Sequence, residues 1–274
     1  MGEFEILCVT MYQRDFSKIQ EMNIHSNVFF ANQADRTGKD EQTFDGHQAQ
    51  MITTETRGVG INRNLTLMYA TGRICLFADD DVTYHDDMEE RVLAEFTNHP
   101  DADIMIFHLE TDSDRKQISY KKTKRCGKFG RMPWGACRIA FRLNSVRKAN
   151  LWFTTLFGGG CVFPAGEDSL WLENARKKGM RIYVSKETIG RVSFAESSWF
   201  TGYDEKYYFG QGAYYQAARP STFYIWMFYS IIRTWKRRDI SVKEKVLWIY
   251  RGKKGYCRML GYEAFKKGIA EGKL

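Results

Sequence analysis

Short apolar runs rich in β-branched and aromatic residues recur along the first 110 residues, separated by polar segments. Each run has the length of one buried strand. The runs are residues 5–11, 27–31, 49–53, 74–78 and 103–109. Strands that alternate with helical segments in this way predict an α/β fold. We expect a mixed, mostly parallel, Rossmann-like sheet with helices on both faces.

The segments between these runs have helical or loop character. Residues 15–22 are expected to form a helix, and so are residues 87–98, where Met88, Val92 and Phe96 recur at every fourth position. The polar stretch 35–46 is expected to form a loop. The Gly-containing stretch 57–64 leads into another predicted helix. Its apolar face is Leu65, Met68 and Tyr69.

The second half of the chain begins with a polar, basic stretch, residues 111–150, and continues with fewer strands. Residues 138–142 are strand-like, and residues 180–194 are expected to form strands. Between them, GEDS opens a helix that ends before Gly179, a typical helix-terminating residue.

Composition indicates a soluble globular protein, since 43% of the 274 residues are hydrophobic and 27% are charged. Six cysteines without a CxxC pair favour a reducing compartment. The N-terminus has no basic stretch followed by a long apolar run, so we expect no signal peptide. Together these features predict a cytoplasmic protein.

The net charge of +8 is concentrated in one C-terminal segment. Residues 233–258 hold ten Lys and Arg against two acidic residues, which accounts for the whole excess. A nucleic-acid-binding protein usually spreads a basic surface over its core domain, so we expect no nucleic-acid partner.

An apolar stretch stands just before this basic segment. Residues 221–232 are strongly apolar, but twelve residues are too few to span a bilayer, which needs about 20. An apolar stripe follows at Val242, Val246, Leu247 and Tyr250. This combination favours contact of residues 221–258 with the inner membrane surface. The alternative is that these helices pack on the core and their lysines are merely solvated.

Three consecutive carboxylates, Asp79, Asp80 and Asp81, follow the run 74–78. If the strand continues, Asp79 and Asp81 point to one side and Asp80 to the other. The first and third could then bind one divalent cation, Mn²⁺ or Mg²⁺, together with phosphate oxygens. The alternative is a solvated acidic turn.

Two further groups carry possible chemistry. Glu167 and Asp168 open the predicted helix after GEDS, where they could cap the helix or act as a general base. The glycines 158–160 precede them and would give a substrate-covering loop its flexibility. Arg57 and Arg63 stand in a Gly-containing loop and could pair with a diphosphate, or could be surface arginines beside a capped helix.

The order of these pieces resembles that of the family 2 glycosyltransferases, which have the GT-A fold. The matching pieces, over roughly residues 5–200, are TMYQRD, the G-x-x-x-x-R-N loop, LFADDDV as a D-x-D motif and FGGG…GEDSLWL. The resemblance implies an inverting transferase that moves a sugar from a nucleotide-diphosphate sugar, usually UDP-linked, to a hydroxyl acceptor. It also implies a glycan or glycolipid acceptor, in cell-surface polysaccharide assembly at the cytoplasmic face of the membrane.

The same resemblance implies roles for single residues. The nucleotide-sugar would contact Thr10, Tyr12, Asp35, Arg57, Arg63, Asp79 and Asp80. Asp81, with Asp79, would bind the metal, and Asp168 would be the base with Glu167 beside it. The acceptor loop would be Gly158, Gly159 and Gly160. By the same likeness, residues 1–110 would bind the donor, residues 111–215 the acceptor, and residues 216–274 would form a helical tail.

Two departures and two rivals accompany this interpretation. Asp35 stands in NQAD, where the family often has D-D-x-S, and no His follows the ED helix, where Glu196 is a possible substitute. A sugar nucleotidyltransferase would need a Gly-rich loop after the first strand, which TMYQRDFSK lacks. The other rival is a non-catalytic membrane-surface protein with a degenerate GT-A fold. The intact DDD triplet and ED pair argue against it, because such a protein would not need them.

Overall fold

The structure is a computed structural model that describes residues 2–111, 120–127, 132, 134–192, 202–237 and 239–274. Its strands are β1 (Phe4–Met11), β2 (Val28–Gln33), β3 (Gly38–Phe44), β4 (His47–Thr54), β5 (Ile74–Asp79), β6 (Val82–Tyr84), β7 (Ile104–Thr111), β8 (Lys124–Arg125), β9 (Ile139–Arg142) and β10 (Ile182–Val192). Its helices are α1 (Lys18–Glu21), α2 (Val59–Tyr69), α3 (Met88–Asn98), α4 (Leu143–Lys148), α5 (Glu167–Lys177), α6 (Glu205–Ala218), α7 (Phe223–Arg233), α8 (Val242–Cys257) and α9 (Tyr262–Ala270).

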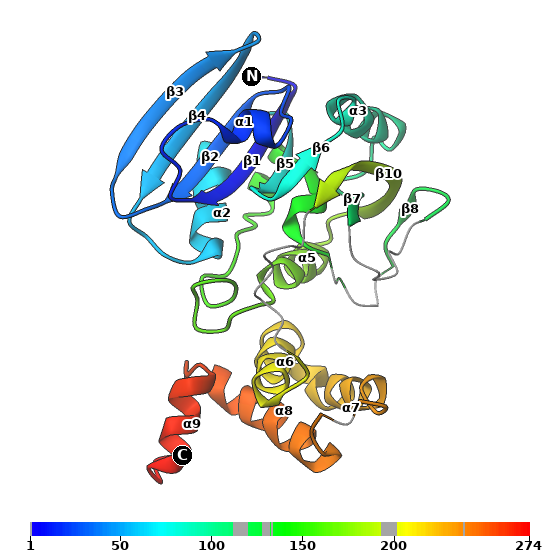
Figure 1. Cartoon of the computed structure of the whole chain (residues 1–274). Coiled ribbons are helices and arrows are strands. Elements are labelled where there is room, and N and C mark those ends of the chain that lie inside the picture. Colours follow the sequence, from blue (N-terminus) through cyan, green and yellow to red (C-terminus); the bar gives the residue numbers. More distant parts are fainter. Residues whose placement is uncertain (1, 112–119, 128–131, 133, 193–201, 238) are drawn as a thin grey trace.

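One mixed sheet organises the upper part of the molecule (Figure 1). Its strand order is β3-β4-β2-β1-β5-β9-β7-β10-β6, with β8 paired to β10. The neighbours β4, β2, β1 and β5 run parallel, and β10 runs parallel to β7. The predicted strands and the mostly parallel sheet are therefore confirmed. The carboxyl ends of β1, β2 and β5 meet at one edge, where ligands of such sheets bind.

The prediction of a loop over residues 35–46 was wrong, because β3 lies there and pairs antiparallel with β4. Its five central residues are exposed. An edge strand with no buried face needs no apolar positions, so hydrophobic patterning does not detect it.

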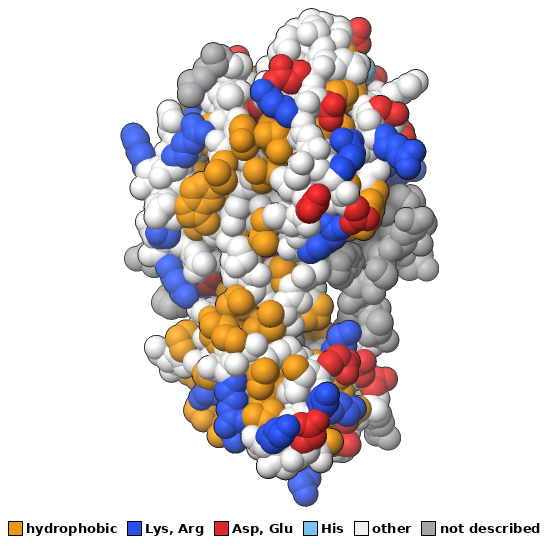
Figure 2. All heavy atoms as spheres, turned by 90° about the vertical axis from the view of Figure 1, so that its left-hand side faces the viewer, with side chains coloured by type: hydrophobic (Ala, Val, Ile, Leu, Met, Phe, Trp, Pro, Cys, Tyr) orange, Lys and Arg blue, Asp and Glu red, His pale blue; other side chains and the backbone are white. Residues whose placement is uncertain are grey.

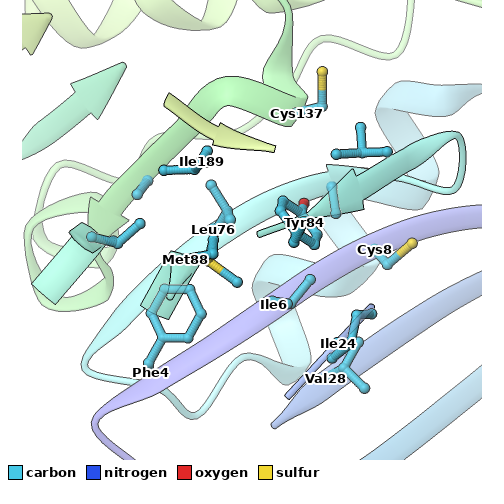
Figure 3. Close-up of a cluster of buried hydrophobic side chains, with 14 of the residues drawn as sticks. Phe4, Ile6, Cys8, Ile24, Val28, Leu76, Tyr84, Met88, Cys137 and Ile189 are labelled. Carbon is cyan, nitrogen blue, oxygen red and sulfur yellow. The ribbon is translucent and has the colours of Figure 1, made fainter. Parts of the chain in front are cut away.

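Helices cover both faces of the sheet, as predicted. One core cluster joins the α3 stripe of Met88, Val92 and Phe96 to inward side chains of β1 and β5, including Ile6 and Leu76. Figure 3 shows this cluster. The opposite cluster joins Phe77 of β5 and its strand neighbours to side chains of α2, α4 and α5.

Helix α2 buries a different face from the one predicted. Met68 and Tyr69 are 63% and 45% exposed. The buried face is Gly60, Asn62, Arg63, Thr66 and Leu67. The polar members of this face have partners inside the protein; Asn62, for example, donates to the carbonyl of Ala31 at 2.7 Å. Apolar periodicity therefore pointed to the wrong side of this helix.

Helices α6–α9 form a separate layer, with α5 between them and the sheet (Figure 1). Helices α6 and α8 cross closely, which glycines at the crossing permit. A Cβ at Gly212 would overlap the carbonyl of Ile249, and a Cβ at Gly252 would overlap the carbonyl of Phe209. A third core cluster joins this layer to the segment before α5 through Phe157 and Phe163. Helix α6 spans the predicted boundary at residue 215.

The apolar stretch 221–232 lies almost entirely in α7, and none of the helices in the described residues has both the length and the apolar content to cross a membrane. Not all of the basic side chains are solvated, since Lys245 is buried and donates to the carbonyls of Thr234 and Arg237 at 2.8 and 2.6 Å. On the face in Figure 2, apolar and basic side chains lie together over the helical layer.

Candidate active site

A cavity of about 660 Å³ opens at the carboxyl ends of β1 and β5. Five segments line it: the end of β1, Gln33 at the end of β2, residues 57–63 at the start of α2, the end of β5 with the turn after it, and residues 159–168 around the start of α5. Its residues include Thr10, Arg57, Arg63, Asp79, Asp80, Asp81, Gly159, Gly160, Glu167 and Asp168. The fold thus brings together most of the side chains that the sequence singled out.

All three consecutive carboxylates face this cavity. Strand β5 ends at Asp79, and the next two residues form the turn to β6, so strand alternation does not apply to them. Asp80 does not point away, as strand alternation predicted, but accepts a hydrogen bond from the hydroxyl of Thr10. Lys18 also donates to the backbone carbonyl of Asp80 at 3.3 Å.

Arg63 is the centre of the site. Its buried guanidinium donates from Nη2 to Asp79 at 2.9 Å and from Nη1 to Glu167 at 3.2 Å. Nη1 also donates to Asp168. Burial alone would lower the pKa of Arg63, but the three carboxylates outweigh it and raise the pKa. This arginine, expected to hold a diphosphate, is paired here with the protein's own acids.

Asp168 is half-buried, with 19% of its side chain exposed, and has specific partners. One carboxylate oxygen pairs with Arg63, and the other accepts a hydrogen bond from the backbone amide of Ala136 at 2.9 Å. Burial raises the pKa of Asp168 to about 7; Arg63 opposes the shift, and the charges of Glu167 and Asp79 add to it. A carboxylate with a pKa near neutrality is suited to take a proton at physiological pH.

Asp81 carries the least compensated negative charge of the triplet. Asp81 is exposed at the mouth of the cavity, but partial desolvation by the surrounding protein raises its pKa to about 6, and repulsion from Asp79 and Asp80 adds to the shift. Among the described residues no cationic side chain forms an ion pair with it, whereas Asp79 has Arg63. A bound cation would relieve this repulsion.

The residues present fit a hard divalent cation, although the described part of the chain holds no cluster of three or more potential ligands. Mg²⁺ is commonly held by one or two carboxylates, with phosphates and water completing the shell. Asp81 and Asp79 supply such oxygens at the cavity wall. Glu196, the possible further ligand, lies outside the described residues.

Two of the three glycines before α5, Gly158 and Gly160, have left-handed backbones and close neighbours that a Cβ would meet. Gly158 has φ +107°, and a Cβ there would overlap Val59 and lie 2.8 Å from Cδ of Glu167. The carbonyl of Gly159 accepts a hydrogen bond from the amide of Val59 at 2.9 Å. This turn ties the start of α2 to the start of α5. Close contact therefore accounts for Gly158 and Gly160, while the flexibility expected of the loop stays a prediction.

The predicted nucleotide-contacting residues Tyr12 and Asp35 stand outside the cavity lining. Arg57 links them, because it pairs with Asp35 and lies 5.8 Å from the ring centre of Tyr12. Tyr12 is 56% exposed and has φ +57°. These three residues form an open rim at the carboxyl end of β1.

Sequence reasoning missed three parts of the site. Asn62 lines the cavity and lies in the Gly-containing stretch 57–64, where the sequence predicted no role for it. Phe153 lies under the guanidinium of Arg63, 5.4 Å from ring centre to carbon. The amide of Ala136 is a backbone group, for which a single sequence holds no signal.

Comparison with known proteins bears on the family and the fold. Residues 31–161 match the family model described as glycosyl transferase family 2, which confirms the resemblance over those residues and supports a glycosyltransferase. No curated protein matches the chain. The crystal structure of S. aureus TarS residues 1–349 is similar at 13% identity, with a TM-score of 0.58 over 96% of this chain and 93% of that one. The same TarS segment with UDP-GlcNAc has a TM-score of 0.57 at 14% identity, over the same shares of the two chains. At such identities the likeness concerns the fold, which is GT-A, as predicted.

Proposed function

We propose that this protein is a metal-dependent, inverting glycosyltransferase that moves a sugar from a nucleotide-diphosphate sugar to a hydroxyl acceptor. The observation that carries the proposal is the Arg63 arrangement: one buried guanidinium joins Asp79, at the end of β5, to Glu167 and Asp168, at the start of α5. Carboxylates from two distant segments thus face one cavity. Asp79 is suited to bind a cation, and Asp168 is suited to accept a proton.

The donor would occupy the cavity between these two groups. The rim formed by Tyr12, Asp35 and Arg57 would contact the nucleotide. The ring of Tyr12 could stack on the base, the carboxylate of Asp35 could bind the ribose, and the guanidinium of Arg57 could bind a phosphate. A UDP-sugar is the first candidate, since TarS, which shares the fold, was crystallised with UDP-GlcNAc and with UDP.

Asp168 would act as the base in a single displacement. It would accept the proton of the acceptor hydroxyl while that oxygen bonds to the anomeric carbon, the bond from this carbon to the diphosphate breaks, and the configuration inverts. Glu167 and Arg63 would fix the orientation of Asp168. A Mn²⁺ or Mg²⁺ ion held by Asp81 and Asp79 would offset the charge of the departing diphosphate.

The acceptor would be a lipid-linked glycan in cell-surface polysaccharide synthesis, with the protein in the cytoplasm and peripheral on the membrane. The basic, aromatic tail supports this part of the proposal, because α7 presents Ile225 and Phe228 at 66% and 64% exposure. The residues of the acceptor loop, Gly158 to Gly160, stand where the acceptor would approach Asp168.

Thermal unfolding with and without a UDP-sugar and Mn²⁺ tests the proposal. The melting temperature of the wild-type protein should rise only when both are present. Asp81→Asn should lose the Mn²⁺-dependent rise in melting temperature. Asp168→Asn should keep this rise but no longer release UDP. The absence of both nucleotide binding and UDP release in the wild type would refute the assignment.

A further inference from the structure

A second cavity, of about 1200 Å³, lies at the other end of α5 from Asp168. It is bounded by the last turns of α5, the segment after β8, and the turn between α6 and α7. From Asp168 to Lys177 the helix rises about 13 Å, so the two cavities share one helix but no lining residue.

Cations predominate around this second cavity. Glu173, buried at 1% exposure, pairs with Arg176 and, at 2.5 Å, with Arg219. Arg125 and Lys177 also line the cavity, and neither has an ion-pair partner within the described residues. Among the described lining residues, four cations therefore surround one acid, and their field favours an anion.

The rest of the lining is largely apolar. Trp226 stands at the wall with the guanidinium of Arg219 4.1 Å from its ring centre. Ile225, in the preceding position of α7, also lines the cavity and is 66% exposed. The cavity therefore joins a basic rim to the outer surface of α7.

That outer surface is an exposed apolar face. We name it the α7 face; its residues are Tyr224, Ile225, Phe228, Tyr229, Ile232 and Trp235, between 43% and 66% exposed. Residues 206–238 include no Asp or Glu, while Arg233, Lys236 and Arg237 follow closely on the apolar positions. An apolar face with only positive charge beside it complements an anionic lipid surface better than a mixed protein surface.

We propose that the second cavity binds the phosphate headgroup of an anionic membrane lipid, whose chains lie along the α7 face. Arg125 and Lys177 contact the phosphate, and Ile225 and Phe228 enter the acyl boundary. This deepens the membrane contact within the proposed function by naming the ligand and the side chains. Lipid binding at this site does not require turnover at the first cavity.

Vesicle flotation of the full chain tests the inference. The probes are vesicles of phosphatidylcholine alone and of phosphatidylcholine mixed with phosphatidylglycerol. Wild type should float with the mixed vesicles and not with the neutral ones. The double variant Arg125→Ala/Lys177→Ala should bind the mixed vesicles about 25-fold more weakly, at about fivefold for each cation. The control Lys39→Ala/Lys148→Ala removes two exposed cations that do not line the cavity, and should bind like wild type.

A second pair of variants tests the apolar part. Ile225→Ser should weaken flotation, and Met68→Ser, which alters a side chain of matching exposure on α2, should not. The proposal would be overturned if Arg125→Ala/Lys177→Ala bound the mixed vesicles as strongly as wild type does. It would also be overturned if wild type bound both vesicle types equally. Thermal shift with UDP-sugar and Mn²⁺ is run in parallel. Normal lipid binding without nucleotide binding would refute the transferase assignment and leave this inference standing.

Discussion

Replacing Arg63 with Met would remove the one cation that joins the two halves of the candidate active site. Methionine keeps most of the side-chain volume, so the change acts mainly on charge. Asp79, Glu167 and Asp168 would then face one another without compensation. Arg63 is only 4% exposed, so water cannot replace the guanidinium without rearrangement.

The expected cost follows from this burial. Breaking a buried ion pair by removing one partner costs about 3–5 kcal/mol of unfolding free energy. A chain of this length unfolds with an entropy of about 0.6 kcal/mol/K, so the melting temperature should fall by about 5–9 °C at pH 8. Protonation of the carboxylates relieves the repulsion. Without the guanidinium, repulsion among the three carboxylates favours proton uptake by the folded state over the unfolded chain, so the loss should shrink toward pH 5.

Thermal unfolding at pH 5 and pH 8, with and without UDP-sugar and Mn²⁺, measures both effects. Arg63→Lys keeps the positive charge but lacks the planar guanidinium, so its melting temperature should lie between those of wild type and Arg63→Met. Arg176→Met is the control, because Arg176 also pairs with a buried acid, Glu173, but lies outside the first cavity. It should lower the melting temperature without altering the donor-dependent shift.

Two results would refute the reasoning about Arg63. An unchanged melting temperature at pH 8 would mean that the carboxylates do not depend on the guanidinium for compensation. An equal loss at pH 5 and pH 8 would mean that the cost comes from packing on Phe153 and not from charge.

Three further predictions concern neighbouring residues. Since burial raises the pKa of Asp168 to about 7, kcat/KM for UDP release should rise with pH through about 7; Asp168→Asn should lose this limb and about 10²–10⁴-fold of the rate, and a retained limb would exclude Asp168 as the base. With the pKa of Asp81 at about 6, the Mn²⁺-dependent rise in melting temperature should weaken as pH falls through 6 and be absent in Asp81→Asn; an unchanged rise at pH 5 would argue against Asp81 as a ligand. Gly158→Ala should lower the unfolding free energy by about 1–3 kcal/mol more than Gly46→Ala in urea, because both have positive φ but only Gly158 has neighbours that a Cβ would meet; equal losses would contradict the packing role.

The buried strands and the main helices could be predicted because each satisfies a local rule. Strands β1, β2, β5 and β7 are apolar runs that both faces of a covered sheet require. Helix α3 repeats its buried positions with the helical period. Strand β3 was not predicted, because its edge position imposes no apolar pattern. The buried face of α2 was predicted wrongly, because that face carries polar side chains whose partners lie elsewhere in the chain.

By itself, the sequence determined which residue types the site contains, because DDD, RN and GED are local patterns whose order resembles that of one family. Only the tertiary structure decided how they interact. Asp79 and Asp168 are 89 positions apart in the chain, and no local rule links them to Arg63 or to the amide of Ala136. The pKa shift of Asp168 has the same origin, because burial and neighbouring charge depend on the packing of α5 against α2 and on the position of β5, which periodicity in a single chain does not encode.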